Sequence, residues 1–499
     1  MPTIPREQAK LPLVLSLDIG SSSIRTMIFD AAGDDLAGLA ARTIYPLELT
    51  DDGGVTAGID TILESVFSAL DDVLAAAGPL AGQIAAVAAC SLVGNVLGVD
   101  AEGRPTSPVY FWADTRPAAD TADLRRRIDG AAWHQRTGTV IHTSYLPARF
   151  LWLARTAPDL LARTAYWMSL GEYLYWRLFG TRACSLSVAS WSGLLNRTTL
   201  TWDAETLALL PIREAQLSPL IDVDAPLHGL TGAFAARWPA LAGIPWLPVV
   251  GDGATANLGS GCTTADQIAV TVGTSGALRV VVTDPIPTVP PGLWVYRVDR
   301  RRALLGGALS NGGNLFDWMR RNLNLAYLTD LEGEIARQPP DGHGLTVLPF
   351  LAGERSPGWA PDAVATITGL RLATTAPEIL RAGLEAVAYR FALIFAGLQP
   401  QVPATRYFIA SGAGLLHSPS WMQIMADVLG MPVIASGEPE ASSRGNALLA
   451  LEVLGAIPGA QTLAGGVSAT YTPDAAHHAV YTRAIARQRD LYARLIPPG

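Results

Sequence analysis

Two turns rich in glycine and hydroxyl groups, each set between two apolar strands, occur about half a chain apart. The first turn, residues 20–23, follows an apolar strand that ends in Asp18. The second turn, residues 273–276, joins strands predicted over residues 267–272 and 277–283. Turns of this kind present backbone N–H groups in a concave array that binds anions, phosphate above all. Two of them in one chain predict two similar domains, each opening with a hairpin.

The length and the alternation of elements predict an α/β protein with two domains. A chain of 499 residues with 49% hydrophobic residues can bury large cores, and it exceeds one ordinary domain. Helical periodicity over residues 59–77 and 378–397 is interleaved with apolar strands in both halves. This alternation favours mixed sheets covered by helices. We place the domain boundary near residue 253, which gives domains of residues 1–253 and 254–499.

Composition excludes several classes of partner. The net charge of −8 argues against a nucleic-acid partner, which needs a basic face, and favours a small-molecule ligand. Cys90, Cys184 and Cys262 lie far apart, so we expect buried free thiols in a reducing, cytoplasmic compartment. The first apolar run ends in Asp18 and indicates a strand rather than a signal peptide. No apolar stretch is long enough to span a membrane.

The near absence of lysine limits how this chain can hold a nucleotide. Lys10 is the one lysine among its 36 basic residues. A Walker A loop, a protein-kinase fold and a pyridoxal enzyme each need a lysine in a defined context, and Lys10 lies in none of them. If the chain binds ATP, backbone N–H groups, hydroxyls, arginine and a metal must therefore hold the phosphates.

A third segment places a carboxylate at the proposed domain junction. The apolar strand before it ends in Asp252, which stands between Gly251 and Gly253. A carboxylate at such a position can accept the proton of an attacking hydroxyl. The same segment, up to Ala256, matches a relaxed dinucleotide fingerprint, the mark of a nicotinamide oxidoreductase. That alternative is disfavoured because no acidic residue follows at the end of a second strand.

A glycine-rich turn and a tryptophan-rich helical region are the remaining features of the sequence. The segment 411–414 is glycine-rich and lies between a strand and a helix, where it can admit an adenosine or serve as a plain turn. The region from residue 116 to about 210 is predicted to be mostly helical, and we interpret its tryptophans as packing residues rather than ligand-stacking residues.

In this order, the motifs resemble the FGGY family of carbohydrate kinases over about residues 14–454. The resemblance is carried by residues 18–25, 112–116, 136–153, 251–259, 271–279, 306–318, 348–357, 411–433 and 440–450. It implies an α/β fold of two actin-like, ribonuclease-H-like domains with the active site in the cleft between them. It also implies ATP-dependent phosphorylation of a hydroxyl on a small sugar, polyol or sugar acid, with Mg²⁺. The N-terminal domain would hold the sugar and the first phosphate motif, and the C-terminal domain the nucleotide.

The resemblance also implies roles for residues at matching positions. Asp252 would be the general base, and Asp18 and Asp252 would hold Mg²⁺. The residues expected to line the phosphates are Gly20, Ser21, Ser22, Arg25, Gly273 and Thr274. The residues expected around the rest of the nucleotide are Gly313, Asp317, Gly412, Ala413, Gly414, Ser418 and Asn446. The family usually has glycine where this chain has Ala413, whose methyl group would narrow the nucleotide pocket.

The sugar side departs from the family pattern. The residues expected to bind substrate are Gly94, Asn95, His142, Ser144, Tyr145 and Asp252. Many members carry a Met-His, Trp-His or Arg-Glu pair where this chain has Val93 and Gly94, which removes a substrate contact. Asn95 is left with two readings, a contact to a sugar hydroxyl or a structural role.

The segments around Asp252, 311–313 and 353–355 are most similar to gluconate kinase-type members, so a gluconate-like substrate is favoured. Two alternatives of function stay open: a pentulose kinase, and a regulator of the same fold that binds sugar with little catalysis. Retention of Asp18, Asp252 and both phosphate turns argues against the regulator. The sequence sets no oligomeric state, and a homodimer is compatible with it.

Overall fold

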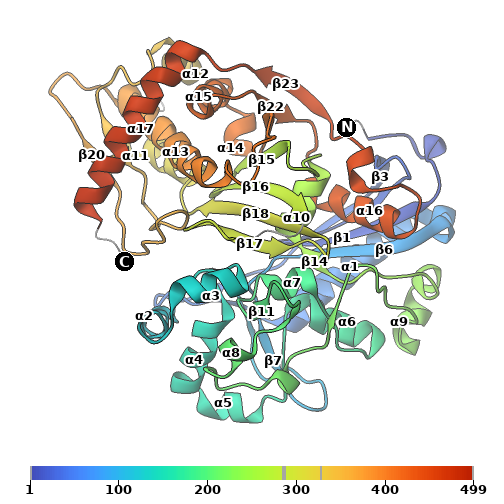
Figure 1. Ribbon diagram of the computed structural model, residues 1–499. Helices are drawn as coiled ribbons and strands as arrows, with labels where there is room; N and C mark the ends of the chain where they lie inside the picture. The colour runs from blue at the N-terminus through green and yellow to red at the C-terminus, as the bar shows by residue number, and fades with distance from the viewer. Residues whose placement is uncertain (1–2, 284–287, 326–328, 497–499) are drawn as a thin grey trace.

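The computed structural model describes residues 3–283, 288–325 and 329–496, and it contains two α/β lobes (Figure 1). The N-terminal half, blue to green in Figure 1, forms one lobe, and most of the C-terminal half forms the other. The prediction of two α/β units is therefore confirmed. None of the described helices is long and apolar enough to cross a bilayer.

The first lobe is built on a five-stranded sheet with the order β14-β6-β1-β2-β3. Strands β1, β2 and β3 are antiparallel neighbours, whereas β6 and β14 run parallel to β1. The bounds are β1 (Leu13–Ile19), β2 (Ser23–Phe29), β3 (Asp35–Ile44), β6 (Ile84–Ser91) and β14 (Val250–Gly251).

The second lobe repeats this arrangement within a seven-stranded sheet, β17-β18-β16-β15-β21-β22-β23. Its strands β18-β16-β15-β21-β22 have the order and directions of β3-β2-β1-β6-β14. The duplication that the two turns predicted is thus present in the topology. The bounds are β15 (Gln267–Val272), β16 (Gly276–Thr283), β17 (Trp294–Arg297), β18 (Arg302–Leu309), β21 (Tyr407–Ser411), β22 (Val433–Ser436) and β23 (Val467–Tyr471).

Helices and short strands complete both lobes. The predicted helical region of the first lobe contains α2 (Ala118–Arg127), α3 (Gly130–Thr137), α4 (Leu146–Thr156), α5 (Pro158–Arg163), α6 (Leu170–Phe179), α7 (Leu186–Ser190) and α8 (Ala204–Leu207), followed by α9 (Gly232–Arg237). The second lobe carries α11 (Gly313–Asn322), α12 (Leu331–Arg337), α13 (Ala376–Leu398), α14 (Ala413–Leu416), α15 (Pro419–Leu429) and α17 (Ala475–Leu495). The short strands are β4 (Glu48–Leu49), β5 (Val55–Ala57), β7 (Leu97–Val99), β8 (Val109–Tyr110), β9 (Tyr166–Met168), β10 (Cys184–Ser185), β11 (Leu195–Asn196), β12 (Thr201–Trp202), β13 (Leu220–Ile221), β19 (Thr346–Leu348) and β20 (Thr366–Thr368).

The alternation of side chains along β1 decides what faces the cleft. Leu13, Leu15 and Leu17 belong to the core beneath α1 (Ile59–Ala77), because successive side chains of a strand point to opposite faces. Val14 belongs to the other core, together with apolar residues of a helix from the C-terminal half. Asp18 shares the face of Val14, so its carboxylate is directed away from α1.

A close crossing of two helices joins the halves of the chain. Helix α10 (Asp252–Gly259) follows β14, and α16 (Ala441–Val453) lies beside the first sheet although it comes from the C-terminal half (Figure 1). A Cβ atom added at Gly259 would lie 1.8 Å from the carbonyl oxygen of Ala441, and one added at Gly445 would lie 1.9 Å from that of Thr255. Only glycine permits this approach of backbone to backbone.

A second seam joins the lobes through the edge strand β17 and the chain before it. The backbone N–H of Val295 donates to the carbonyl of Gly138 at 2.9 Å, and the His134 imidazole bonds the Leu293 carbonyl at 2.6 Å. The predicted domain boundary after residue 253 falls inside α10, at the other contact between the lobes. The boundary itself stays a prediction.

The helix crossing generates a stability prediction. We expect Gly445→Val to lower the free energy of unfolding by about 3 kcal/mol, because α16 must move away from α10 to admit the side chain. Urea unfolding followed by tryptophan fluorescence measures the change. Gly243→Ala is the matched control, since a Cβ atom there meets no atom within 4 Å. The crossing would not be tight if Gly445→Val unfolded at the wild-type urea midpoint.

Candidate active site between the lobes

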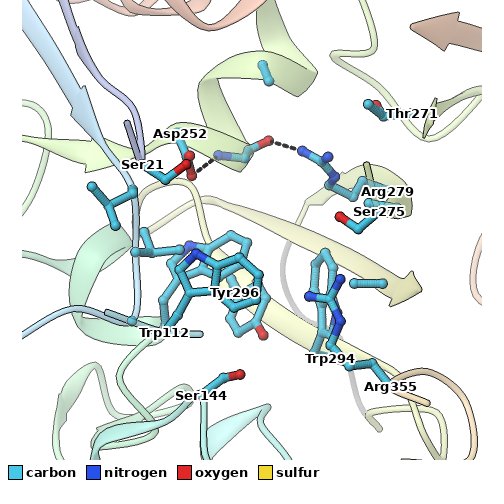
Figure 2. A pocket seen from close by; sticks show the side chains of 18 of the residues that line it. Ser21, Trp112, Ser144, Asp252, Thr271, Ser275, Arg279, Trp294, Tyr296 and Arg355 are labelled. Atoms are coloured by element: carbon cyan, nitrogen blue, oxygen red, sulfur yellow. Dashed lines mark hydrogen bonds between the residues drawn. The ribbon is translucent and has the colours of Figure 1, made fainter. Parts of the chain in front are cut away.

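A cavity of about 440 Å³ opens between the two lobes beside Asp252 (Figure 2). The first lobe contributes residues from the turn after β1, the loop after β6 and the start of α10. The second lobe contributes the β15–β16 hairpin, strand β17 and the loop around residue 355. The residues that line the cavity include Ser21, Val93, Gly94, Trp112, Ser144, Tyr145, Trp191, Asp252, Gly273, Ser275, Arg279, Trp294, Tyr296, Arg355 and Trp359.

Sheet geometry brings Asp18 and Asp252 to the same end of the first sheet. Cys90 of β6 pairs with Asp18 on one side and with Val250 on the other. Strand β14 ends at Gly251, and α10 begins at Asp252. Asp18 therefore lies near the carboxyl end of β1, and Asp252 directly follows the carboxyl end of β14. Ligands bind at the carboxyl ends of parallel strands in sheets of this kind.

The Asp252 carboxyl has a pKa raised to about 6. Burial is the main cause, and the negative charge of Asp18 adds to it, because both disfavour the ionised form. The guanidinium of Arg279 and the backbone N–H of Gly253, which donates to Asp252 Oδ1 at 2.7 Å, act in the opposite direction. Figure 2 shows the bonds that join Asp252 to Gly253 and Gly253 to Arg279. A carboxyl of this kind is well suited to proton transfer near neutral pH.

Asp18 is buried close to Asp252, but it is not among the residues that line the cavity. Its Oδ1 accepts a bond from the Cys90 thiol at 3.3 Å, and its Oδ2 lies 3.5 Å from Arg25 Nη1. Burial nevertheless raises the pKa of Asp18. Arg25 also lies 3.3 Å from the carboxylate of Glu440, which precedes α16. The first turn is thus linked to the C-terminal half through one arginine.

Each of the two predicted phosphate turns is closed by a backbone hydrogen bond, although the first turn is one residue longer. The N–H of Gly20 donates to the Ser23 carbonyl at 2.9 Å, and the N–H of Gly273 donates to the Ser275 carbonyl at 3.0 Å. Ser21 and Gly273 both line the cavity, whereas Ser22 is exposed next to it in sequence. The structure therefore brings the two turns together across one cleft.

Four of the residues predicted to bind nucleotide gather behind the second turn. The Gly313 N–H donates to the Gly273 carbonyl at 2.8 Å, and the Thr274 carbonyl also accepts a bond from this segment. A Cβ atom would lie 2.4 Å from the Val272 carbonyl oxygen if added at Gly412, and 3.0 Å from it if added at Gly414. The glycines thus let the 412–414 segment touch the end of β15. The Ala413 side chain is exposed, so its methyl group does not fill this contact.

Three other predicted nucleotide residues lie apart from this group or are already engaged. Asp317 is exposed on α11. The Ser418 hydroxyl caps α15 and donates to Glu332 at 2.6 Å. The Asn446 amide is buried and donates to Ser16 Oγ at 3.1 Å. The structure gives Ser418 and Asn446 structural roles, and contacts of these side chains with adenosine stay predictions.

The prediction that Asn95 contacts a sugar hydroxyl is not supported by the geometry. Its amide nitrogen donates to the Leu92 carbonyl at 2.6 Å, and its oxygen accepts from the Leu170 N–H at 2.7 Å. Both ends of this buried side chain form hydrogen bonds with backbone groups, which favours a structural role for Asn95. Gly94 does line the cavity, at φ +67°, and a Cβ atom there would lie 2.9 Å from the Ser144 carbonyl oxygen. No side chain fits at that position without displacement.

The second predicted substrate segment does reach the cavity. Ser144 and Tyr145 line it, and the hydroxyl of Tyr145 lies 2.5 Å from that of Tyr296 in the other lobe. His142 does not line the cavity itself but contacts two residues that do. Its Nδ1 accepts a hydrogen bond from the Ser144 N–H at 3.1 Å, and its ring packs edge-to-face with Trp359. Burial and the positive charge of Arg355 lower the pKa of His142 to about 3, so its imidazole is neutral.

The sequence reasoning missed the aromatic lining and both arginines of the cavity. Trp191 stacks on Tyr296 at 3.6 Å between ring centroids, and Tyr296 stacks on Trp294 at 4.4 Å. Trp191, from the predicted helical region, thus packs against strand β17 and also lines the cavity. The missed residues Trp112, Arg279 and Arg355 all lie within segments that carried the family resemblance, which is the signal that could have identified them.

Comparison with known proteins agrees with this arrangement of the cleft. Family models described as the N-terminal and C-terminal domains of the FGGY family of carbohydrate kinases match residues 13–259 and 268–452. A gluconokinase of Bacillus licheniformis is 27% identical, over 92% of this chain and 91% of the relative. A glycerol kinase of Alkalilimnicola ehrlichii is 29% identical, over 95% of this chain and 97% of the relative.

Solved structures are similar over almost the whole chain. A gluconate kinase from Lactobacillus acidophilus has a TM-score of 0.91 at 24% identity and covers 98% of this chain and 99% of its own. A xylulose kinase from Rhodospirillum rubrum has a TM-score of 0.89 at 25% identity, with 97% and 99% covered. With both family models matched and the fold of two actin-like domains in place, the chain belongs to the FGGY family of carbohydrate kinases and is a carbohydrate kinase.

Proposed function

We propose that this kinase transfers the terminal phosphoryl group of ATP to a hydroxyl of a small sugar acid such as gluconate. The charge of the cavity carries the proposal. Asp252 is the only acidic residue among the described residues that line it, whereas Arg279 and Arg355 are both basic. A site of net positive charge favours a substrate that carries a carboxylate over a neutral polyol or pentulose. The similarity to gluconokinases supports the same choice.

In the proposed mechanism, Asp252 accepts the proton of the attacking hydroxyl. It stands at the first position of α10, enclosed by the cleft and beside the first phosphate turn. Its pKa of about 6 leaves most of the population ionised at neutral pH, and therefore able to act as a base. In phosphoryl transfer the protein contributes mainly position and electrostatic stabilisation, so the placement of Asp252 matters more than its basicity.

The two turns and the adjoining arginines are suited to hold the phosphates. Ser21 and Gly273 of the two turns line one cleft, and Arg25 and Arg279 would supply the positive charge that lysine supplies elsewhere. A Cβ atom at Gly273 would meet no atom within 4 Å, so the turn has open space in front of it.

Asp18 and Asp252 are the residues that would hold Mg²⁺. The negative charge of Asp18 raises the pKa of Asp252, and a bound cation would offset this repulsion. When bound, Mg²⁺ supplies positive charge to the phosphate oxygens.

Replacement of Asp252 tests the proposed base. We expect Asp252→Asn to lower kcat by about 10³-fold with gluconate, because the proton acceptor is lost, and to retain ATP binding. A coupled assay of ADP release and a titration with ATP measure the two properties. Turnover within a few-fold of the wild type would remove Asp252 from the role of base.

The same variant has a pH-dependent effect on stability. Because the folded protein raises the pKa of Asp252, ionisation destabilises the fold above pH 6 and ceases to do so as the pH falls toward the ordinary carboxyl value. Without nucleotide or metal, we expect Asp252→Asn to be more stable than the wild type by about 3 kcal/mol at pH 8. The difference should shrink as the pH falls below 6 and vanish below the ordinary carboxyl pKa of about 4, and thermal unfolding across this range measures it. A constant difference at all pH values would contradict the assigned cause.

A substrate panel tests the substrate class. We expect ADP release with MgATP to be fastest with aldonates such as D-gluconate and slower with glycerol, D-xylulose and other neutral acceptors. Fastest turnover with D-xylulose would favour a pentulose kinase instead. Binding without turnover of any acceptor would favour a sugar-binding regulator. Omission of Mg²⁺ is the control, since the proposed reaction stops without it.

A further inference from the structure

We propose that Arg355 selects the substrate by pairing with its carboxylate at the end of the cavity remote from Asp252. The proposal rests on the sugar-acid function proposed above and assigns the acid recognition to one side chain. Arg279 and Arg355 are the two arginines that could bind the carboxylate, and they differ in their hydrogen-bond partners and in their distance from Asp252.

The backbone around Arg355 is held firmly on both sides. Glu354 forms a buried ion pair with Arg390 and accepts a bond from the Tyr492 hydroxyl at 2.6 Å. On the other side, the Ser356 N–H donates to the Ala308 carbonyl at 2.9 Å, in strand β18. The backbone position of Arg355 is therefore well defined. A residue that orients a ligand needs such a position.

The Arg355 guanidinium has no carboxylate partner in the part of the chain that the structure describes. Among the residues that the structure describes, no acidic group lies within ion-pair distance of it; its Nη2 donates to the Leu309 carbonyl at 2.6 Å. Its carbon Cζ lies 5.4 Å from the ring centroid of Trp112, which restricts its plane. Burial of a cation without an anion is costly, and a carboxylate from the substrate would offset the cost.

Neighbouring groups at this end of the cavity accommodate an anion. The groups that interact electrostatically with Arg355 are the hydroxyls of Tyr145 and Tyr296 and the guanidinium of Arg279, none of which is negative at neutral pH. Ser144 also lines this end and can donate from its hydroxyl. Among the described residues, these hydroxyls and guanidinium groups can offer hydrogen-bond donors and positive charge to a bound carboxylate.

The Arg279 guanidinium lies at the Asp252 end of the cavity. Its Nη1 donates to the Gly253 carbonyl at 3.1 Å, and its charge acts on the Asp252 carboxylate. In Figure 2, Arg355 lies beyond Tyr296 and Trp294 from Asp252. The order along the cavity is therefore Asp252, Arg279 and Arg355. A sugar acid bound to Arg355 would present a hydroxyl distant from its carboxylate to Asp252.

The test compares an acid with its uncharged counterpart. We would measure kcat and KM for D-gluconate and for D-glucitol in the wild type, Arg355→Gln, Arg355→Lys and Arg125→Gln. We expect Arg355→Gln to lower kcat/KM for gluconate about 100-fold, mainly through KM, and to change the glucitol value little. Arg355→Lys should recover part of the loss, because it keeps the charge without the planar fork.

Arg125→Gln is the matched control. This arginine also donates to a backbone carbonyl, that of Ile141 at 3.0 Å, but it does not line the cavity beside Asp252. We expect it to leave the preference for gluconate over glucitol unchanged. The stabilisation of each protein by gluconate, read as a shift in thermal midpoint, gives the same comparison without turnover and shows whether each variant is folded.

The outcomes separate the two proposals. A wild type that does not prefer gluconate to glucitol would overturn the proposed function itself. A wild type that prefers gluconate, together with an Arg355→Gln variant that keeps this preference or loses both substrates equally, would overturn only the role of Arg355.

Discussion

The crossing of α10 and α16 is the contact on which the rest of the site depends. Gly259 and Gly445 let two helices from different halves of the chain meet at backbone distance, and the Arg444 guanidinium adds a bond to the Gly259 carbonyl at 2.8 Å. Because Asp252 is the first residue of α10, the crossing sets where its carboxylate enters the cleft. The same helix α16 follows Glu440, which contacts Arg25 behind the first phosphate turn. One packing contact therefore positions the proposed base and supports one of the turns expected to hold the phosphates.

The cleft separates charge along its length. At one end, burial and then the negative charge of Asp18 raise the pKa of Asp252 to about 6, and Arg25 and Arg279 lie nearby. At the other end, Arg355 faces tyrosines and a neutral His142. A stack of aromatic rings, Trp191, Tyr296 and Trp294, lies between and comes from both lobes. Such a surface suits an extended polar substrate with a carboxylate at one end and a reactive hydroxyl at the other.

The sequence predicted most of the fold and the reacting end of the site. The hairpin of β15 and β16, helix α1 and the segment of Asp252 follow from local patterns, because strand periodicity and glycine turns are local properties. The seams between the lobes do not, since no local pattern indicates that Gly445 meets Thr255 or that Val295 pairs with Gly138. The surroundings of two further side chains likewise depend on contacts between distant segments. Asn95 is engaged by Leu170, far along the chain, and Trp191 reaches the cavity because strand β17 of the other lobe stacks on it.

The central claim is that one cleft brings the Asp252 carboxylate, both phosphate turns and the sugar together. A crystal structure of the wild type with Mg²⁺, a non-hydrolysable ATP analogue and D-gluconate tests it most directly. The account predicts the terminal phosphate between the turns at Gly20 and Gly273, and a sugar hydroxyl within hydrogen-bond distance of Asp252. A sugar bound outside the cavity, or a terminal phosphate that contacts neither turn, would contradict it.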